Sequence, residues 1–175
     1  MASPIPERVL WAVETLAVEP DDRLLEIGCG PGVAISLIAE RLGAGTITAI
    51  DRSAVAVERA RWRNAAHVES GLATIRRAAL KELEPAGERF DKIFAVNVNV
   101  FWVRETGPEL ELIRRLLQPE GSLFLFYGGA PVEARTPPIA DTVLGALTMH
   151  GFTATQLTPP ERSPLLGFVA RPLTA

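Results

Sequence analysis

Cysteine and histidine, which build disulfides and most structural metal sites, are scarce in this sequence of 175 residues. Its single cysteine, Cys29, excludes an intramolecular disulfide, and together with two histidines it offers no spacing typical of a zinc site. We therefore expect no bound metal. One free thiol suits a reducing compartment, and we expect a cytoplasmic protein.

Long apolar runs and a strong charge excess are absent as well. No apolar run reaches the roughly 20 residues that a membrane-spanning helix needs, so we expect no membrane partner. Glu7 and Glu14 interrupt the N-terminal segment, which therefore lacks the basic-then-apolar order of a signal peptide. The formal net charge of −3 gives no general attraction to nucleic acid, and we expect no such partner.

A local basic stretch is the exception to this charge balance, and it consists of Arg59, Arg61, Arg63, Arg76 and Arg77. We interpret it as the solvated face of a helix and the end of a strand. A patch that binds RNA or another substrate is the alternative interpretation.

Apolar and polar residues alternate along the chain in a way that indicates one α/β domain over residues 1–175, without repeats or linkers. Short apolar or β-branched runs predict strands at residues 24–27, 46–50, 72–77, 92–98, 122–127, 153–157 and 165–170. Helical spacing predicts helices at residues 9–17, 33–42, 53–64, 105–117 and 139–150. Because the early strands are apolar throughout, we expect a mostly parallel sheet with helices on both faces.

The segment LLEIGCGPG, residues 24–32, places a glycine loop at the carboxyl end of the first predicted strand. Gly28 and Gly30 match the dinucleotide fingerprint G-x-G-x-x-G, but Val33 stands where the third glycine belongs. Pro31 removes one backbone N–H, and Glu26 would repel a pyrophosphate but attract a cation. A ligand without phosphates is favoured, and a tight turn without any ligand is the alternative.

A carboxylate follows the second predicted strand at Asp51, 23 residues after Gly28. A carboxylate at this position accepts hydrogen bonds from the two hydroxyls of a ribose, and it would repel a 2′-phosphate. The alternative interpretation is that Asp51 caps the following turn or helix. Together, Asp51 and the glycine loop predict a cofactor that contains a ribose.

These residues resemble the class I, Rossmann-like methyltransferases that use S-adenosylmethionine. The resemblance rests on E-I-G-C-G-P-G at 26–32 and T-A-I-D at 48–51, supported by F-D-K-I-F-A-V-N at 90–97 and L-Q-P-E-G-S-L at 117–123. It implies a three-layer sandwich with helices on both faces of a seven-stranded sheet. The implied strand order is 3-2-1-4-5-7-6, with the seventh strand antiparallel.

The same resemblance implies how S-adenosylmethionine would be held. The backbone of Gly28, Gly30 and Gly32 would approach the methionine part and the adenosine. Glu26 would face the ammonium group, Asp51 would bind the ribose, and Arg52 would flank the adenine. The usual polar contact to adenine after the third strand is replaced by Ala78 and Ala79, whose backbone would hold the base instead.

The methyl acceptor should bind beyond the fourth strand, where the chain reads N-V-N-V-F-W from Asn97 to Trp102. Asn97 matches the first position of the Asn/Asp-Pro-Pro-aromatic motif, but Val98 and Asn99 replace the prolines, which argues against amino methylation of DNA bases. The candidates on the acceptor side are Asn97, Asn99, Trp102 and Tyr127, and Asn97 is also a candidate for the cofactor. Turn formation by the asparagines and core packing of the aromatic residues are the alternatives.

The sequence therefore predicts an S-adenosylmethionine-dependent methyltransferase that acts on a small molecule. The alternatives are a protein or RNA methyltransferase, a non-catalytic module that binds S-adenosylmethionine or a nucleotide, and an NAD-dependent dehydrogenase. The predicted core occupies nearly the whole chain, which leaves no large insertion to cover a substrate. The site is then open, the substrate is large, or a mobile N-terminus or the second subunit of a homodimer closes it.

Overall fold

The computed structural model describes residues 4–84, 87–103, 106–128, 136–160 and 163–173, with the side chains of all of these except 102, 103 and 136–138. The strands are β1 (Arg23–Ile27), β2 (Thr46–Asp51), β3 (Ala73–Arg77), β4 (Phe90–Val96), β5 (Leu117–Tyr127), β6 (Phe152–Leu157) and β7 (Leu166–Pro172). The helices are α1 (Glu7–Thr15), α2 (Val33–Ala39), α3 (Ala54–Arg63), α4 (Ala65–Glu69), α5 (Val100–Val103), α6 (Gly107–Leu116) and α8 (Thr136–Met149), with a 3-10 turn η1 (Leu80–Glu82).

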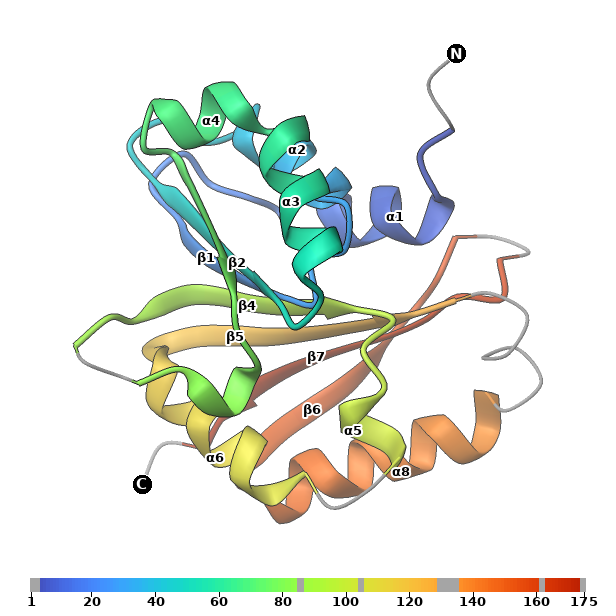
Figure 1. The fold of residues 1–175 in the computed structure, drawn as a ribbon. Helices are drawn as coiled ribbons and strands as arrows, with labels where there is room; N and C mark the ends of the chain where they lie inside the picture. Colours follow the sequence, from blue (N-terminus) through green and yellow to red (C-terminus); the bar gives the residue numbers. More distant parts are fainter. Residues whose placement is uncertain (1–3, 85–86, 104–105, 129–135, 161–162, 174–175) are drawn as a thin grey trace.

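All seven strands form one sheet in the order β3-β2-β1-β4-β5-β7-β6 (Figure 1). The first five strands pair in parallel, whereas β7 is antiparallel to both of its neighbours, β5 and β6. The predicted fold class, strand order and direction of the seventh strand are therefore confirmed. Because consecutive strands run away from β1 on either side, the sheet has a switch point between β1 and β4, where such folds bind ligands.

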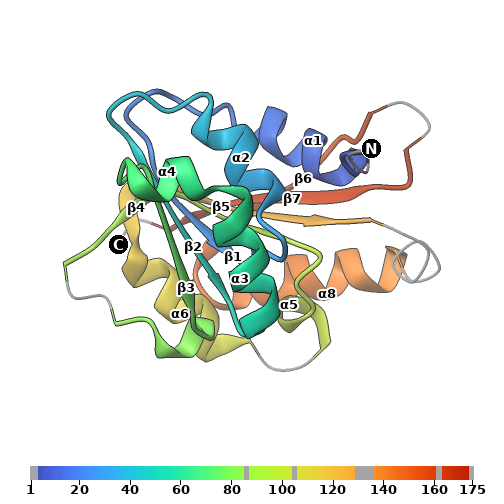
Figure 2. The ribbon, with the colours of Figure 1, turned by 45° about the horizontal axis from the view of Figure 1, so that its top comes forward.

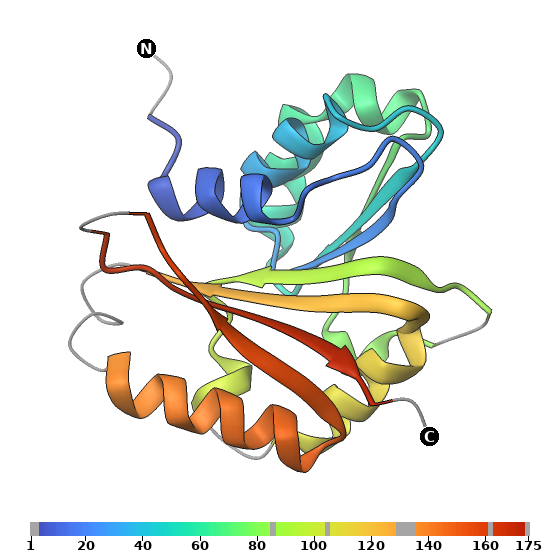
Figure 3. The same ribbon diagram turned by 180° about the vertical axis from the view of Figure 1, so that it is seen from behind.

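Helices cover both faces of the sheet, and strand alternation explains how. In β5, Leu123 and Leu125 pack with α6 and α8, while Phe124 and Phe126 pack with the helices of the other face. Figure 2 shows α1, α2 and α3 on that other face, and Figure 3 shows α1 and α8 on opposite sides of the sheet. Trp11 of α1 packs edge-on against Phe126, with ring centroids 5.3 Å apart.

The structure confirms one predicted helix start and shifts the predicted end of one strand, each for a local reason. Ser53 caps α3 as expected, because its hydroxyl accepts a hydrogen bond from the Ala56 N–H at 3.3 Å. The strand expected at residues 92–98 ends at Val96, since Asn97 has a left-handed backbone with φ of 57°. Short elements such as α4, α5 and η1 escaped the sequence analysis because each has less than two helical turns of pattern.

A partly buried ion pair lies near the amino ends of β1 and β4, opposite the carboxyl ends of these strands. Lys92 Nζ lies 2.6 Å from Asp22 Oδ2 and donates to the Ala17 carbonyl at 2.9 Å. Asp22 Oδ2 also accepts from the Glu19 N–H at 2.7 Å, so β4 is tied to the α1–β1 connection. Within the described ranges, no helix is both long and apolar enough to cross a lipid bilayer.

Candidate cofactor site

A cleft of about 1130 Å³ opens at the carboxyl ends of β1, β2, β3 and β4. The described residues that line it are 27–28, 50–52, 77–82, 96–100 and Glu109. Parallel strands meet this edge with their carboxyl ends, which is why side chains from four distant segments converge there. The cleft is lined by six of the residues that the sequence nominated for the cofactor, Gly28, Asp51, Arg52, Ala78, Ala79 and Asn97, and by the acceptor candidate Asn99.

The glycine loop has no free N–H group between residues 28 and 32. The N–H groups of Gly28 and Cys29 both donate to the Ile50 carbonyl, at 2.8 and 3.0 Å. The Gly30 N–H donates to Asp51 Oδ2 at 2.9 Å, and the Gly32 N–H donates to the Cys29 carbonyl at 3.0 Å. Pro31 has no N–H to offer. Every N–H group of the loop is thus paired within the protein, and none remains to donate a hydrogen bond to a pyrophosphate.

Glycine is required at position 32 both by the backbone and by close packing. The φ angle is 76°, and a Cβ atom would lie 2.6 Å from Asn64 Nδ2 and 2.9 Å from the Ala60 Cα. The Asn64 amide, which is buried, donates to the carbonyls of Gly32 and Ala60 at 3.0 and 2.9 Å. It also accepts from the Ser36 hydroxyl at 2.8 Å. Sequence analysis missed this clamp between α2 and α3, since Asn64 reads only as a helix end.

The carboxylate of Asp51 lies between the glycine loop and the cleft. Its Oδ2 atom accepts from the Gly30 N–H at 2.9 Å, and its Oδ1 atom accepts from the Ser53 N–H at 2.8 Å. Each carboxylate oxygen has a second lone pair, so Asp51 remains able to accept hydrogen bonds from a ligand. The capping role that the sequence left open and a ligand-binding role are therefore compatible. Arg52 is exposed at the rim, where its carbonyl accepts from Arg77 Nε at 3.3 Å.

Glu26 lies behind the loop and outside the cleft lining. Its side chain is 3% exposed, and its Oε2 atom has no hydrogen-bond partner. Burial, reinforced by the charge of Asp51, raises the pKa of Glu26 from 4.5 to about 8. The Glu26 carboxyl group therefore has an unpaired oxygen atom, and a cationic group placed near it would stabilise its ionised form. Burial also raises the pKa of the neighbouring Cys29 thiol.

Asn97 is engaged in a structural clamp. Its Nδ2 atom donates to the Gly128 carbonyl at 2.8 Å, and its Oδ1 atom accepts from the Gly128 N–H at 2.9 Å. The amide thus joins the segments that leave β4 and β5. The neighbouring Val98 lies over the glycine loop, since a Cβ atom at Gly28 would be 2.7 Å from Val98 Cγ2. Asn99 is exposed and lines the cleft.

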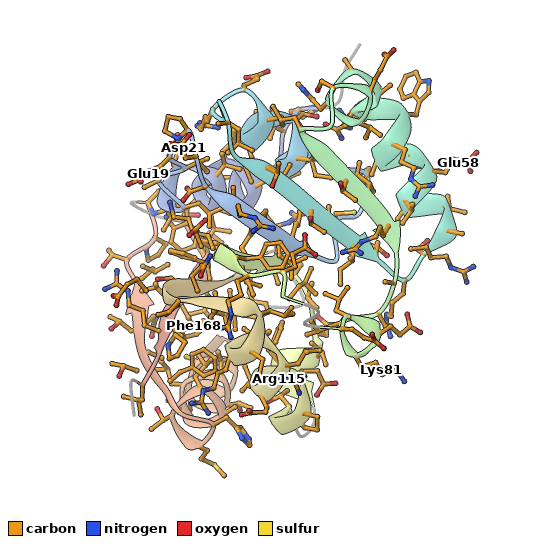
Figure 4. All side chains as sticks on the ribbon, turned by 90° about the vertical axis from the view of Figure 1, so that its left-hand side faces the viewer. Glu19, Asp21, Glu58, Lys81, Arg115 and Phe168 are labelled. Atoms are coloured by element: carbon orange, nitrogen blue, oxygen red, sulfur yellow. The ribbon has the colours of Figure 1, made fainter. Side chains whose placement is uncertain are left out.

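Of the two aromatic acceptor candidates, only Tyr127 has a side chain among the described residues, and it lies in the core. Tyr127 is 1% exposed and packs edge-on against Phe168, a core residue labelled in Figure 4. It shares a face of the sheet with Leu125 because side chains alternate along β5. The expectation that Tyr127 faces the acceptor is therefore corrected to a place in the core. Trp102 belongs to α5, and its side chain lies outside the described residues.

The wall of the cleft after β3 contains a carboxylate that sequence analysis missed. The Ala78 N–H donates to the Asp51 carbonyl at 3.0 Å, and the Ala79 N–H donates to Glu82 Oε2 at 2.7 Å. The signal was available, because a glutamate three residues after a turn start is typical of a cap. No group of three metal-ligating side chains occurs among the residues described.

Comparison with known proteins identifies the family. A family model described as a methyltransferase domain matches residues 24–121, more than half of the chain. Trans-aconitate 2-methyltransferase of Delftia acidovorans is 32% identical over 121 residues, which cover 67% of this chain and 43% of that protein. Ribosomal protein L11 methyltransferase of Ruminiclostridium cellulolyticum is 37% identical over 78 residues, 45% of this chain and 24% of that protein. The chain thus spans less than half the length of these relatives.

The fold agrees with this match. The solved structure of the S-adenosylmethionine-dependent methyltransferase SibL superposes with a TM-score of 0.73 at 19% identity, covering 95% of this chain and 55% of that one. The matched segment runs from β1 into β5, so it includes both the glycine loop and Asp51. The chain belongs to the class I methyltransferases that depend on S-adenosylmethionine.

Proposed function

We propose that this chain transfers a methyl group from S-adenosylmethionine to a small-molecule acceptor by in-line displacement. One observation supports the choice of cofactor above the others. Every N–H of the loop from Gly28 to Gly32 is paired within the protein or absent, while the carboxylate of Asp51 borders the cleft. A pyrophosphate needs donors, whereas an ammonium group and a ribose need acceptors.

The residues present fit such a ligand. Asp51 would accept hydrogen bonds from the ribose hydroxyls, and Arg52 would flank the base at the rim. The backbone of Gly28, Gly30 and Gly32 would lie against the ligand, since glycine allows close approach. The unpaired Oε2 of Glu26 would stabilise the ammonium group from beneath the loop. The backbone at Ala78 and Ala79 would border the adenine.

When bound, S-adenosylmethionine supplies a methyl carbon that its sulfonium already activates. The protein then has to orient the acceptor and exclude water, and a strong general base is not required. Asn99 and Glu109 line the cleft beyond β4 and are available to hydrogen-bond an acceptor. We assign Asn97 a positioning role, because its amide holds Gly128 beside the acceptor side of the cleft.

The size of the cleft supports a small acceptor. Ligand-binding clefts typically have volumes of about 300–1,000 Å³, and this one measures about 1130 Å³. That volume accommodates a nucleoside cofactor together with a small second substrate. The relative from Delftia acidovorans, whose name identifies trans-aconitate as its substrate, favours the same class.

A protein acceptor is the second candidate. It is favoured by the 37% identity to the ribosomal protein L11 methyltransferase, although that match covers less than half of this chain. Transfer of a labelled methyl group to purified ribosomal protein L11, compared with transfer to a panel of small carboxylic acids, alcohols and thiols, distinguishes the two.

The cofactor proposal is tested by isothermal titration calorimetry with S-adenosylmethionine, S-adenosylhomocysteine and NAD. We expect the two sulfur nucleosides to bind and NAD not to bind. Asp51→Asn should weaken binding by about 1.5–3 kcal/mol, the usual contribution of a hydrogen bond to a charged group. Asp21→Asn is the matched control, because Asp21 is exposed and precedes β1, at the opposite edge of the sheet (Figure 4). Binding of NAD alone would refute the proposal.

We further propose that the chain works in the cytoplasm and that a second copy closes the open cleft in a homodimer. Sedimentation velocity with and without S-adenosylhomocysteine measures the assembly state. If the protein is monomeric at all concentrations, the homodimer proposal is wrong and the cleft is open in the working protein.

A further inference from the structure

One edge of the sheet is formed by a stretch of chain that has no charged side chain. Residues 142–160, which comprise the second half of α8 and all of β6, contain no Asp, Glu, Lys or Arg, although 22% of the residues of the chain are charged. β6 is the last strand of the sheet, and α8 lies along it (Figure 3). Much of this stretch is exposed, including Thr153, Thr155 and Gln156 of β6 and Met149, which is 81% exposed. No charge at this edge therefore opposes the approach of another chain.

The pairing of β6 with β7 determines which main-chain groups of β6 point to the open edge. The Leu173 N–H donates to the Gly151 carbonyl at 2.8 Å, and the pairing continues from there along both strands without a shift. Hydrogen-bonded and non-hydrogen-bonded pairs alternate along an antiparallel ladder, so the odd-numbered residues of β6 are bonded to β7. The N–H and C=O groups of Phe152, Ala154 and Gln156 therefore point outward, where no described residue pairs with them.

The other edge of the sheet is protected in a way that β6 is not. On β3, the Ile75 carbonyl accepts from Nη2 and Nε of Arg61 at 2.6 and 3.0 Å, and Arg76 and Arg77 are exposed. Proteins keep edge strands from pairing with other chains by such charges, by proline or by bulges. β6 has no charge, proline or register shift over Phe152–Leu157. The outer edge of β6 is therefore able to pair with a further strand.

The sequence of β6 is complementary to a second copy of itself. It reads F-T-A-T-Q from Phe152 to Gln156 and is nearly symmetrical about Ala154. Two such strands, antiparallel about a twofold axis at Ala154, would place Ala154 opposite its own copy and Thr153 opposite Thr155. The outward-pointing residues would then form the hydrogen-bonded pairs, and the threonines would form the closer, non-hydrogen-bonded pairs. Because threonine pairs across strands are favourable, this register suits the side chains as well as the main chain.

The helix beside β6 is suited to the same contact. Phe152 and Ala154 pack on the face of the sheet that α8 covers, so pairing of β6 would bring the α8 helices of two copies to one face of the joined sheet. Gly145, in the middle of α8, is exposed and has nothing within 4 Å of its Cβ position, which permits a close approach of another helix. A charged partner would have to desolvate its charges against this surface, whereas a second copy brings none.

We propose that two copies of this chain pair through the outer edges of their β6 strands, about a twofold axis at Ala154, into one continuous sheet with the two α8 helices side by side. This surface is separate from the cleft, which lies at the carboxyl ends of β1, β2, β3 and β4. The paired homodimer therefore leaves both clefts accessible to their acceptors, and a contact that closes a cleft uses another surface. The inference requires neither the cofactor nor a methyl acceptor.

Charges introduced at the two exposed threonines test this pairing and its register. The double variant Thr153→Lys with Thr155→Lys places cations opposite each other, and Thr153→Glu with Thr155→Glu places anions opposite each other. We expect sedimentation velocity to show a wild-type dimer, and each double variant to have a dissociation constant at least about tenfold higher, because like charges directly opposite destabilise a strand pair. An equal mixture of the two double variants should form a heterodimer, since opposite charges then face each other.

Two further variants separate edge pairing from a general effect of substitution. Thr74→Lys is the matched control, because Thr74 is exposed on β3, the other edge strand, and this variant should dimerise like the wild type. Ala154→Pro removes an outward N–H group and leaves the bonds between β6 and β7 in place, so it should prevent dimerisation. Circular dichroism should give the wild-type spectrum for every variant.

The outcomes separate this inference from the proposed function. A wild-type protein that is monomeric at all concentrations would overturn the pairing, and so would double variants that dimerise like the wild type. A mixture of the two double variants that stays monomeric would refute the register about Ala154. A dimer that forms only with S-adenosylhomocysteine and resists these substitutions would place the contact at the cleft instead. None of these results depends on methyl transfer, so failure of the pairing leaves the proposed function standing.

Discussion

Replacing Glu26 with glutamine tests the electrostatics of the site without changing its shape. The side chain is 3% exposed, and Oε2 has no hydrogen-bond partner. Burial and the nearby charge of Asp51 raise the pKa of Glu26 from 4.5 to about 8. Glutamine has nearly the same volume as protonated glutamate but cannot ionise, so it removes only the titration.

The sign of the effect follows from proton binding in the two states. Unfolded Glu26 releases its proton near pH 4.5, whereas the folded protein keeps it until about pH 8. Between these values the folded state binds one more proton, so the free energy of unfolding falls as pH rises, by about 1.4 kcal/mol per pH unit. The stabilising contribution of the bound proton is therefore complete at low pH. It should decline by about 3 kcal/mol by pH 7 and by about 5 kcal/mol above pH 8.

Urea unfolding of the wild-type protein and Glu26→Gln at several values between pH 5 and pH 9 measures this difference. We expect the variant to gain stability relative to the wild type as pH rises, with most of the gain between pH 5 and pH 8. Asp51 and Cys29, which face Glu26, are present in both proteins, so the difference reports Glu26 alone. Parallel pH profiles would refute the reasoning, and Glu84→Gln, with its exposed side chain, should give such a parallel profile.

Ligand binding should be linked to the same proton. If the ammonium group of S-adenosylhomocysteine lies near Glu26, it favours the ionised carboxylate, and binding releases a proton. Affinity should then rise between pH 6 and pH 8 in the wild-type protein, and calorimetry in buffers of different ionisation enthalpy should detect the release. Glu26→Gln should bind without that release.

Three further predictions concern individual contacts. Gly32→Ala should lower the free energy of unfolding by about 2–5 kcal/mol, because the new Cβ atom would clash with Asn64 and Ala60 and alanine disfavours the left-handed backbone. Gly30→Ala should lower it by only about 1–2 kcal/mol, because the backbone is also left-handed there but nothing lies within 4 Å of the Cβ position. Urea unfolding separates the two, and equal costs would contradict the packing argument. Asn97→Ala should remove both hydrogen bonds to the segment after β5, destabilise the protein by about 2–3 kcal/mol, and speed amide exchange there. Lys92→Met leaves the buried Asp22 carboxylate without its cation, so it should lower the free energy of unfolding by about 2–4 kcal/mol. The double variant Lys92→Met with Asp22→Asn should regain part of this loss in urea unfolding.

Local patterns determined much of the site in advance. The spacing of Gly28, Gly30 and Gly32 predicted a loop at the end of β1, and all three glycines have positive φ angles. The distance to Asp51 predicted a carboxylate at the end of β2, where it lies. These features are readable because each depends on the backbone conformation of a few consecutive residues.

What the sequence analysis missed depends on contacts between segments that it could not place side by side. Nothing in the sequence indicated that the Asn97 amide, which lines the cleft, is hydrogen-bonded to Gly128, 31 residues away, and its contact with a ligand stays a prediction. Tyr127 follows the alternation of β5, yet only the packing of the helices decides which face of the strand opens onto the cleft. Glu82 was missed because η1 is too short to be recognised in the sequence, and it is this turn that brings the carboxylate to the Ala79 N–H.

The sequence by itself determined the fold class, the order of the strands through its family resemblance, the glycine loop and the position of the Asp51 carboxylate at the end of β2. Only the tertiary structure decided that every N–H group of the loop is paired within the protein, that Glu26 is buried with its Oε2 atom unpaired, and which side chains of β4 and β5 reach the cleft. The physical reason is that conformational preference is local, whereas hydrogen-bond pairing and desolvation depend on every segment that packs against a group.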